Sequence, residues 1–140
     1  PIELDLPKQE HVPASSIIDF NDGKWSPIHR PGRAPATLAR IENGRRQHGD
    51  RFVTPYYGSG SGETGRSLDR PIGTITTIAR WAVIDGDRMR MLSVPEARRA
   101  MTVPDTYKLP DNGRLAMHLM GNAVPPLAAR KIITAVRKAA

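Results

Sequence analysis

The sequence predicts a small mixed α+β domain, rich in loops, that contains a short twisted antiparallel sheet. Short runs of β-branched and aromatic residues, at 51–57, 74–78 and 81–84, favour strands. Apolar residues recur at helical spacing in two other segments, 36–46 and 125–138. The 140 residues include 12 glycines and 13 prolines, which interrupt long elements and favour turns.

The first 35 residues are predicted to form an irregular arm, because five prolines break any long element. These prolines are Pro7, Pro13, Pro27, Pro31 and Pro35. Within the arm, residues 15–20 could form a short strand or one helical turn, and residues 21–24 have the composition of a turn. Trp25 is expected to anchor the arm against the core.

A helix over 36–46 is expected to place Leu38 and Ile41 on its apolar side. The strand at 51–57 contains Pro55, which cannot donate a ladder hydrogen bond and therefore predicts an edge strand. A glycine-rich loop follows, and its residues 60–65 match the pattern G-x-G-x-x-G. A dinucleotide site needs a helix directly after that pattern, which Pro71 and Gly73 disfavour, so we predict a mobile loop instead.

A β-hairpin is predicted further along the chain. Asp85-Gly86-Asp87 has the composition of a hairpin turn and lies between the strand at 81–84 and a strand expected at 88–92. Ser93 and Glu96 then have the spacing of a capping box, with Pro95 in the first helical turn. We therefore expect a short helix from Pro95 to about Met101.

Two helices are predicted at the C-terminal end. The first covers 114–120, with Leu115, Leu119 and Met120 facing inward. The second covers 125–138 and is expected to bury one apolar stripe while its lysines and arginines face water. The stripe consists of Ala128, Ala129, Ile132, Ile133 and Val136.

The linker between these helices has the sequence Gly121-Asn122-Ala123-Val124-Pro125-Pro126. Gly121 permits a backbone conformation, or a close approach, that a Cβ would forbid. Asn122 can hydrogen-bond nearby backbone or a ligand. Taken alone, each of these residues is explained equally well by the entry into a helix, with Asn122 as its cap.

The net charge of +7 favours a polyanionic partner, most often nucleic acid, although a merely soluble basic protein has the same property. The basic residues around 36–51 could equally form a solvated polar face or contact phosphates. The chain has no cysteine, which excludes disulfides, thiolate zinc sites and thiol nucleophiles. Its four histidines lack metal-ligand spacing, and no apolar run is long enough to cross a membrane, so we expect no metal and no membrane partner.

Three short sequence motifs follow one another between residues 70 and 126. Arg70, Pro71 and Thr74 form R-P-x-x-T; residues 90–101 read R-M-L-S-V-P-E-A-R-R-A-M; and 121–126 read G-N-A-V-P-P. Over residues 66–136 this order resembles the C-terminal part of a DNA cytosine-5 methyltransferase, in which the outer strings are motifs IX and X. The sequence around Tyr56-Tyr57-Gly58 and Ser67-Leu68-Asp69 is similar to a phage-like branch of that family, which includes restriction-modification enzymes. The chain departs from the family pattern at Ser93, Thr102 and Leu119, where Thr, Gly and Gln are usual.

The resemblance implies an S-adenosyl-L-methionine-dependent enzyme that methylates carbon 5 of a flipped cytosine. In the family a Cys thiolate first adds to carbon 6, and this chain has no Cys. We therefore expect no catalytic residue here and an inactive fragment, whose missing N-terminal catalytic domain is Rossmann-like. The first residue, Pro1, also suggests an excised piece. By the same resemblance the protein would be cytoplasmic, in a bacterial or phage-infected cell.

The arm at 1–35 follows from composition alone, and the resemblance implies roles for the other regions. Residues 36–113 would form the target-recognition domain with motif IX, and 114–140 the motif X loop and a helix that packs on the missing domain. Double-stranded DNA would contact Arg40, Arg45, Arg46, Arg51, Tyr57, Ser59 and Arg66. Asn122 and Ala123 would complete the edge of the S-adenosyl-L-methionine pocket. Structural roles in the motifs would belong to Arg70, Pro71, Thr74, Glu96, Gly121 and Pro125, with Arg70 and Thr74 holding the recognition region against the rest.

Two other functions remain open. The chain could be a free-standing DNA-binding module or the non-catalytic subunit of a split methyltransferase, as its charge allows. It could also be a basic RNA-associated protein, although RNA readers usually present aromatic stacking platforms and only Phe52, Tyr56 and Tyr57 cluster here.

Overall fold

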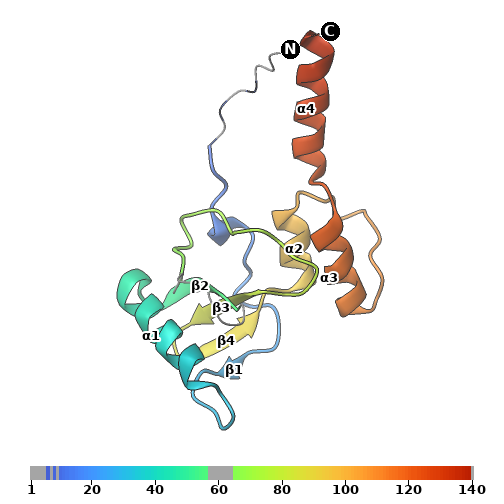
Figure 1. Cartoon of the computed structure of the whole chain (residues 1–140). Helices are drawn as coiled ribbons and strands as arrows, with labels where there is room; N and C mark the ends of the chain where they lie inside the picture. The colour runs from blue at the N-terminus through green and yellow to red at the C-terminus, as the bar shows by residue number, and fades with distance from the viewer. Residues whose placement is uncertain (1–5, 7, 9, 57–64, 140) are drawn as a thin grey trace.

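The computed structural model describes residues 6, 8, 10–56 and 65–139 (Figure 1). Its centre is a four-stranded antiparallel sheet in the order β1-β4-β3-β2, with helices around it, which confirms the predicted α+β class. The strands are β1 (Ser26–Pro27), β2 (Arg51–Pro55), β3 (Trp81–Asp85) and β4 (Arg88–Met91). The helices are η1 (Ala14–Ser16, a 3-10 turn), α1 (Pro35–His48), α2 (Val94–Ala100), α3 (Gly113–Asn122) and α4 (Pro126–Ala139).

The predicted hairpin is confirmed. Strands β3 and β4 pair with Asp85 opposite Arg88, so Gly86 and Asp87 form a two-residue turn. Gly86 has φ 56°, a left-handed conformation that glycine adopts without a steric penalty. Strand β2 pairs with β3 and lies at the edge of the sheet, with Pro55 as its last residue, as the proline predicted.

The sheet has a hydrophobic core on each face, because successive strand residues point to opposite sides. On one face α1 covers the sheet, and Ile41 packs with Phe52 and Ile84. On the other face Val53, Trp81 and Val83 pack against η1, α2 and α3. The members of this second core from outside the sheet include Ala14, Ile17, Ala97, Met117 and Met120.

The arm is more ordered than predicted. Its segment 14–16 forms one 3-10 turn, which confirms the helical alternative for part of 15–20. Ser26 and Pro27 pair with β4 as an edge strand, so the expectation of an irregular arm is wrong there. Trp25 stacks on Phe20 with ring centroids 6.3 Å apart, and both rings pack against the core as expected for an anchor.

The strand predicted over 74–78 is wrong. This segment pairs with no strand of the described chain. It lies beside the Trp81 side chain, whose Nε1 donates to the Thr74 carbonyl at 3.1 Å. Gly73 lies so close to the Trp81 ring that a Cβ would collide with it. Ile75 is buried, so the β-branched composition reflects burial rather than strand pairing.

Helix α2 begins as predicted. Ser93 Oγ accepts from the Glu96 backbone N–H, and the Glu96 side chain accepts from the Ser93 N–H, which completes the capping box. Past the end of the helix, Thr102 has φ 55°, a left-handed conformation that costs a non-glycine residue about 1–2 kcal/mol. Its Oγ1 accepts from Leu127 N in the first turn of α4 at 3.3 Å, a contact that the family's usual glycine could not make.

The prediction for α3 is right about the helix and about buried Met120, and wrong about Leu115 and Leu119. Ala116, Met117 and Met120 are buried, whereas Leu115 and Leu119 are 48% and 41% exposed. Helix α3 packs on α2, and that contact selects the face. Asn112 caps the helix through its side-chain Oδ1, which accepts hydrogen bonds from the backbone N–H groups of Arg114 and Leu115.

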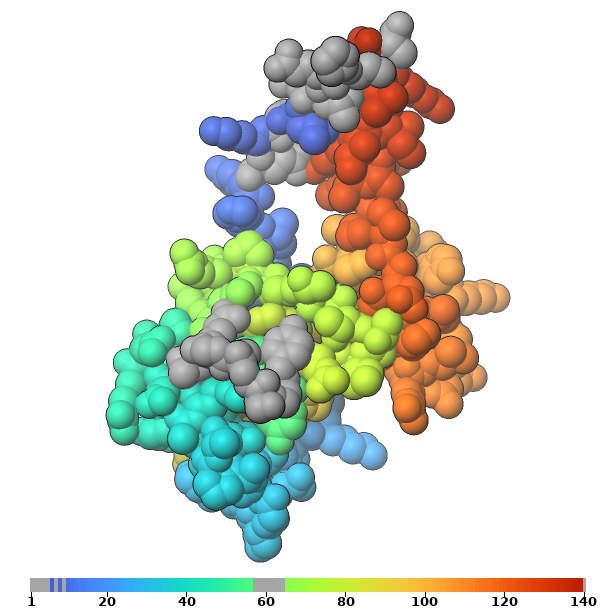
Figure 2. Space-filling model, in the orientation of Figure 1, coloured from blue at the N-terminus to red at the C-terminus, as the bar shows by residue number. Residues whose placement is uncertain are grey.

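Helix α4 extends away from the sheet (Figures 1 and 2), and none of its described residues is buried. The predicted stripe is therefore not buried in this chain: Ile132, Ile133 and Val136 are 48%, 52% and 40% exposed. The amphipathic pattern is present, but no other element of the described chain covers it. No helix among the described residues has both the length and the apolar character needed to cross a membrane.

Candidate nucleic-acid interface

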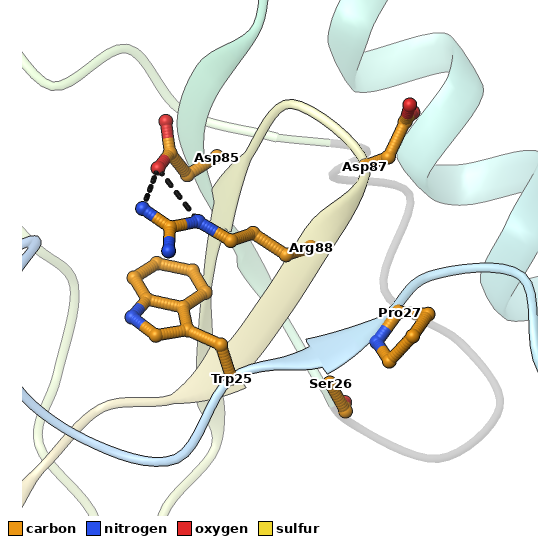
Figure 3. A pocket seen from close by; sticks show the side chains of 6 residues that line it. All are labelled: Trp25, Ser26, Pro27, Asp85, Asp87 and Arg88. Carbon is orange, nitrogen blue, oxygen red and sulfur yellow. Dashed lines mark hydrogen bonds and ion pairs between the residues drawn. The ribbon is translucent and has the colours of Figure 1, made fainter.

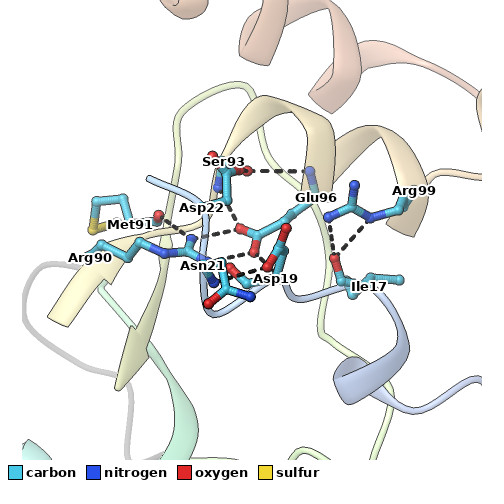
Figure 4. Close-up of polar contacts among 9 residues, drawn as sticks. All are labelled: Ile17, Asp19, Asn21, Asp22, Arg90, Met91, Ser93, Glu96 and Arg99. Carbon is cyan, nitrogen blue, oxygen red and sulfur yellow. Dashed lines mark hydrogen bonds and ion pairs between the residues drawn. The ribbon is translucent and has the colours of Figure 1, made fainter. Parts of the chain in front are cut away.

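A buried ion pair joins β4, α2 and the arm (Figure 4). Arg90 and Glu96 are 4% and 0% exposed, and Arg90 donates from Nη2 to Oε1 at 2.6 Å and from Nη1 to Oε2 at 2.7 Å. Glu96 Oε1 also accepts from the backbone N–H of Asp19 at 2.9 Å, and Arg90 Nη2 donates to the Asp19 carbonyl at 2.7 Å. Glu96, predicted as a structural residue of the motif, therefore holds three segments together.

The charge state of Glu96 follows from these contacts. Burial alone would raise its pKa, but the hydrogen bonds from Arg90, Ser93 and Asp19, together with the charge of Arg90, outweigh burial. The pKa of Glu96 is consequently lowered from its ordinary 4.5. A carboxylate that is ionised, paired and shielded from solvent is suited to holding the fold rather than to exchanging protons with a substrate.

Three arginines that we predicted to contact DNA also make contacts within the chain. Arg40 donates to the Pro55 carbonyl at 3.2 Å, and Arg45 donates to the Gly86 carbonyl at 2.7 Å. Arg51 donates to Asp85 at 2.7 Å, although its side chain is 59% exposed. Their contacts fix where the cations lie, and DNA contact by them stays a prediction.

Two of the other predicted DNA residues, Arg46 and Arg66, also make contacts within the chain. Arg46 is 72% exposed and pairs loosely with Glu42 at 3.7 Å, one helical turn away. Arg66 donates to the Pro71 carbonyl at 3.2 Å and lies over the Trp81 ring at 5.2 Å. Tyr57 and Ser59 lie outside the described residues.

A surface cluster that the sequence analysis missed contains Trp25, Arg88 and Asp85 (Figure 3). The Arg88 guanidinium lies 4.4 Å from the centre of the Trp25 ring and donates to Asp85 at 2.6 and 2.9 Å. Burial would raise the pKa of Asp85, but hydrogen bonds from Arg51 and Arg88 and their charges lower it below 3.8. The alternation of Arg88 and Arg90 with methionines was the available signal, because it places both arginines on one face of β4.

The motif IX residues lie on the surface. Arg70 and Thr74 are exposed, and Pro71 is partly buried. Their backbone carbonyls are used inside the chain: that of Arg70 accepts from Ala14 N at 2.8 Å, and that of Thr74 accepts from Trp81 Nε1. That the Arg70 and Thr74 side chains hold the recognition region against the rest stays a prediction.

The motif X residues lie next to motif IX. Gly121 and Asn122 are the last residues of α3, and a Cβ at Gly121 would collide with the backbone of Thr76 and Thr77. The close approach predicted for this glycine is therefore confirmed. Between the two motifs is a hollow of about 400 Å³ whose lining includes Gly73, Gly121, Ala123 and Pro125.

Asn122 itself is exposed, and its Nδ2 lies 3.1 Å from His118 Nε2. Partly buried Ala123 lines the hollow between the two motifs, whereas Asn122 is not among its lining residues. Cofactor contact by these two residues stays a prediction. No group of three or more histidines and carboxylates that could hold a metal occurs in the described ranges.

The order of the motifs and their packing agree with the comparison to protein families. The family model for C-5 cytosine-specific DNA methylase matches residues 14–138. No curated protein and no solved structure matches the chain. Since the family match covers most of the sequence, from η1 into the last turn of α4, the chain belongs to the C-5 cytosine-specific DNA methylases.

Proposed function

We propose that this chain is the DNA-recognition part of an S-adenosyl-L-methionine-dependent cytosine-5 methyltransferase and that the reactive cysteine is supplied by residues outside it. The observation that carries the proposal is the absence of cysteine from a sequence that belongs to this family. Carbon 5 of cytosine becomes nucleophilic only after a nucleophile adds to carbon 6, and a thiolate is suited to that step.

The side chains of this chain are consistent with a nucleophile that is supplied from outside it. Glu96 is the most buried carboxylate of the described chain, and both of its oxygens bind Arg90. It therefore cannot reach a base that has been flipped out of a duplex. Two serine hydroxyls donate to carboxylates, Ser93 to Asp22 at 2.9 Å and Ser67 to Asp69 at 3.1 Å, and these contacts lie in a helix cap and in a turn.

The exposed side of α4 supports a partner for this chain. Ile132, Ile133 and Val136 are 48%, 52% and 40% exposed and lie on one side of α4 at helical spacing. An apolar helix side that is left exposed is typical of an interaction site. We propose that a catalytic domain, Rossmann-like in its family, covers this side of the helix.

The cofactor edge is part of the same proposal. Asn122 and Ala123 would form one rim of the S-adenosyl-L-methionine site, with the hollow lined by Gly73, Gly121 and Pro125 behind them. The cofactor supplies an electrophilic methyl group when it is bound. The residues of this chain would orient it by an amide hydrogen bond from Asn122 and by apolar contact at Ala123.

Double-stranded DNA is the proposed partner of the basic residues on α1 and β2. Arg46 is 72% exposed and lies 3.7 Å from exposed Glu42, so it can turn to a phosphate at little cost. Arg51 is 59% exposed while it is held by Asp85, so it would meet a phosphate in its present position. The domain boundaries follow the same division: arm to residue 35, recognition domain 36–113, and motif X with α4 from 114.

Duplex binding tests the proposal. We expect the 140-residue chain to bind duplex DNA more tightly than single-stranded RNA of equal length at the same salt concentration, by fluorescence anisotropy. The logarithm of the association constant should fall linearly with that of the salt concentration, with a slope of about −0.9 per phosphate contacted. Equal affinity for the two nucleic acids, or tighter binding of RNA, would contradict the proposal and favour an RNA-associated protein.

A further inference from the structure

A hollow of about 370 Å³ lies where the end of α1, the segment 65–71 and the arm meet. Its polar lining consists of His11, His48, Arg66, Ser67 and Arg70, and no carboxylate is among its lining residues. The three segments are far apart in the sequence, so folding brings these polar side chains together. A small hollow that is lined by two arginines, two histidines and a serine, with no carboxylate, has the donor groups that an anion site needs.

His48 packs beside Phe52 and has a ring nitrogen without a partner among the described residues. Its ring lies 6.1 Å from that of Phe52, tilted by 46°, and its Nε2 is shielded from solvent without a hydrogen-bond partner among the described residues. A buried polar atom without a partner is unfavourable unless a ligand satisfies it. Gly65 leaves room beside the ring, because a Cβ there would lie 3.1 Å from His48 Cδ2.

The two arginines differ in their freedom. The Arg66 guanidinium is held by the Pro71 carbonyl and the Trp81 ring. Arg70 is exposed, and no hydrogen bond or ion pair engages its guanidinium within the described ranges. Asp69, the nearest acid in sequence, is occupied by Ser67, whose Oγ donates to Oδ2 at 3.1 Å. Arg70 is therefore the cation that can turn toward an incoming anion.

We propose that this hollow, the His48–Arg70 hollow, binds one phosphate of the DNA backbone. The inference rests on the proposed function, because duplex DNA is the polyanion that it invokes. A phosphate oxygen would accept hydrogen bonds from Arg70 and from His48 in its Nε2–H form, while Arg66 contributes fixed positive charge. The contact reads no base, so it sets the position of the protein on the duplex rather than its choice of sequence.

Arg70→Gln is the primary test, because the residue is exposed and its loss leaves the core intact. At 0.15 M salt we expect binding of any duplex sequence to weaken about fivefold, and the salt slope to become less negative by about 0.9. Arg114→Gln removes the same charge from an exposed arginine at the start of α3 and should change the slope by much less. Arg70→Lys, which keeps the charge, should restore most of the slope.

The outcomes separate the two proposals. If the wild-type chain fails to bind duplex DNA, the proposed function fails. If the wild type binds but Arg70→Gln matches Arg114→Gln in affinity and slope, the hollow is not a phosphate site. A loss shared equally by Arg70→Lys would also overturn the inference, because a phosphate contact depends on the charge.

Nuclear magnetic resonance of the imidazole protons distinguishes DNA phosphate from a free anion. Duplex DNA is expected to shift the His48 resonance in the wild type and much less in Arg70→Gln, whereas inorganic phosphate at the same total phosphate concentration leaves it in place. Saturation of the shift by inorganic phosphate, without a response to the duplex, would overturn the assignment to the DNA backbone. His48→Gln, which keeps an N–H donor, serves as the second variant.

Discussion

Glu96→Gln is expected to lower the free energy of unfolding by about 3–5 kcal/mol, a large fraction of the stability of a domain of this size. The substitution removes one charge of a pair that is 0% and 4% exposed and leaves Arg90 buried without its counter-ion. It also places an amide N–H₂ group against a guanidinium donor. Because Asp19 binds both members of the pair, the arm should loosen from α2 as well.

Urea unfolding followed by circular dichroism measures this effect. Glu42→Gln is the matched control, because Glu42 is 52% exposed and lies 3.7 Å from Arg46, and its loss should cost less than about 0.5 kcal/mol. A change of less than about 1 kcal/mol in the free energy of unfolding for Glu96→Gln would contradict the role of the buried Arg90–Glu96 pair in holding the arm, the sheet and α2 together.

The pH dependence of the same variant provides a second readout. The pKa of Glu96 is lowered in the folded state, so its contribution is fully present above its ordinary pKa of 4.5 and is lost as the pH falls through the lower folded value. Wild-type stability should therefore decline with acid below about pH 4.5, and less steeply in Glu96→Gln. Asp85, whose pKa is also lowered, accounts for part of the slope that remains.

Gly121→Ala is expected to cost about 2–3 kcal/mol, although alanine is the better helix former. A Cβ at this position would collide with the backbone of Thr76 and Thr77 and lie 2.6 Å from the Thr76 carbonyl oxygen. Backbone cannot rotate aside as a flexible side chain can, so α3 or the 74–78 segment must shift. Because this contact joins motif X to motif IX, the hollow between them should change shape.

The matched control is Gly113→Ala in the same helix. Nothing lies within 4 Å of a Cβ at Gly113, so the substitution should stabilise the chain by up to about 1 kcal/mol. Opposite signs for the two substitutions, measured by thermal or urea unfolding, are the expected result. If Gly121→Ala is as stable as the wild type, the two motifs do not pack as described.

Local signals in the sequence were sufficient for several elements. The turn at 85–87, the capping box of Ser93 and Glu96, and the edge position of Pro55 each depend on residues close in the chain, and all three are confirmed. Their physical causes are local backbone geometry and hydrogen bonding. Nothing distant in the chain needs to be known to predict them.

Where the choice depended on a distant partner, the sequence was ambiguous. The segment 74–78 has strand composition but packs on the Trp81 ring and on Gly121 instead of pairing. Leu115 and Leu119 are as apolar as the residues that α3 buries, and only contact with α2 selects the buried face. The apolar stripe on α4 was recognisable from its helical periodicity, but that periodicity does not show what surface covers the stripe.

The candidate site shows the same limit. The family resemblance implied DNA contacts for arginines of α1 and β2, but not that Arg45 and Arg51 would also bind Gly86 and Asp85 within the chain. The His48–Arg70 hollow combines the arm, α1 and motif IX. Its residues are separated by up to about sixty positions in the sequence, so no local pattern could have grouped them.

Methyl transfer by this chain alone tests the central claim most directly. The chain would be incubated with duplex DNA and S-adenosyl-L-methionine carrying a radiolabelled methyl group, and label in the DNA would be counted beside duplex binding in the same sample. The account predicts binding without transfer, because no cysteine is present to add to carbon 6. Catalytic formation of 5-methylcytosine by the unaided chain would contradict it.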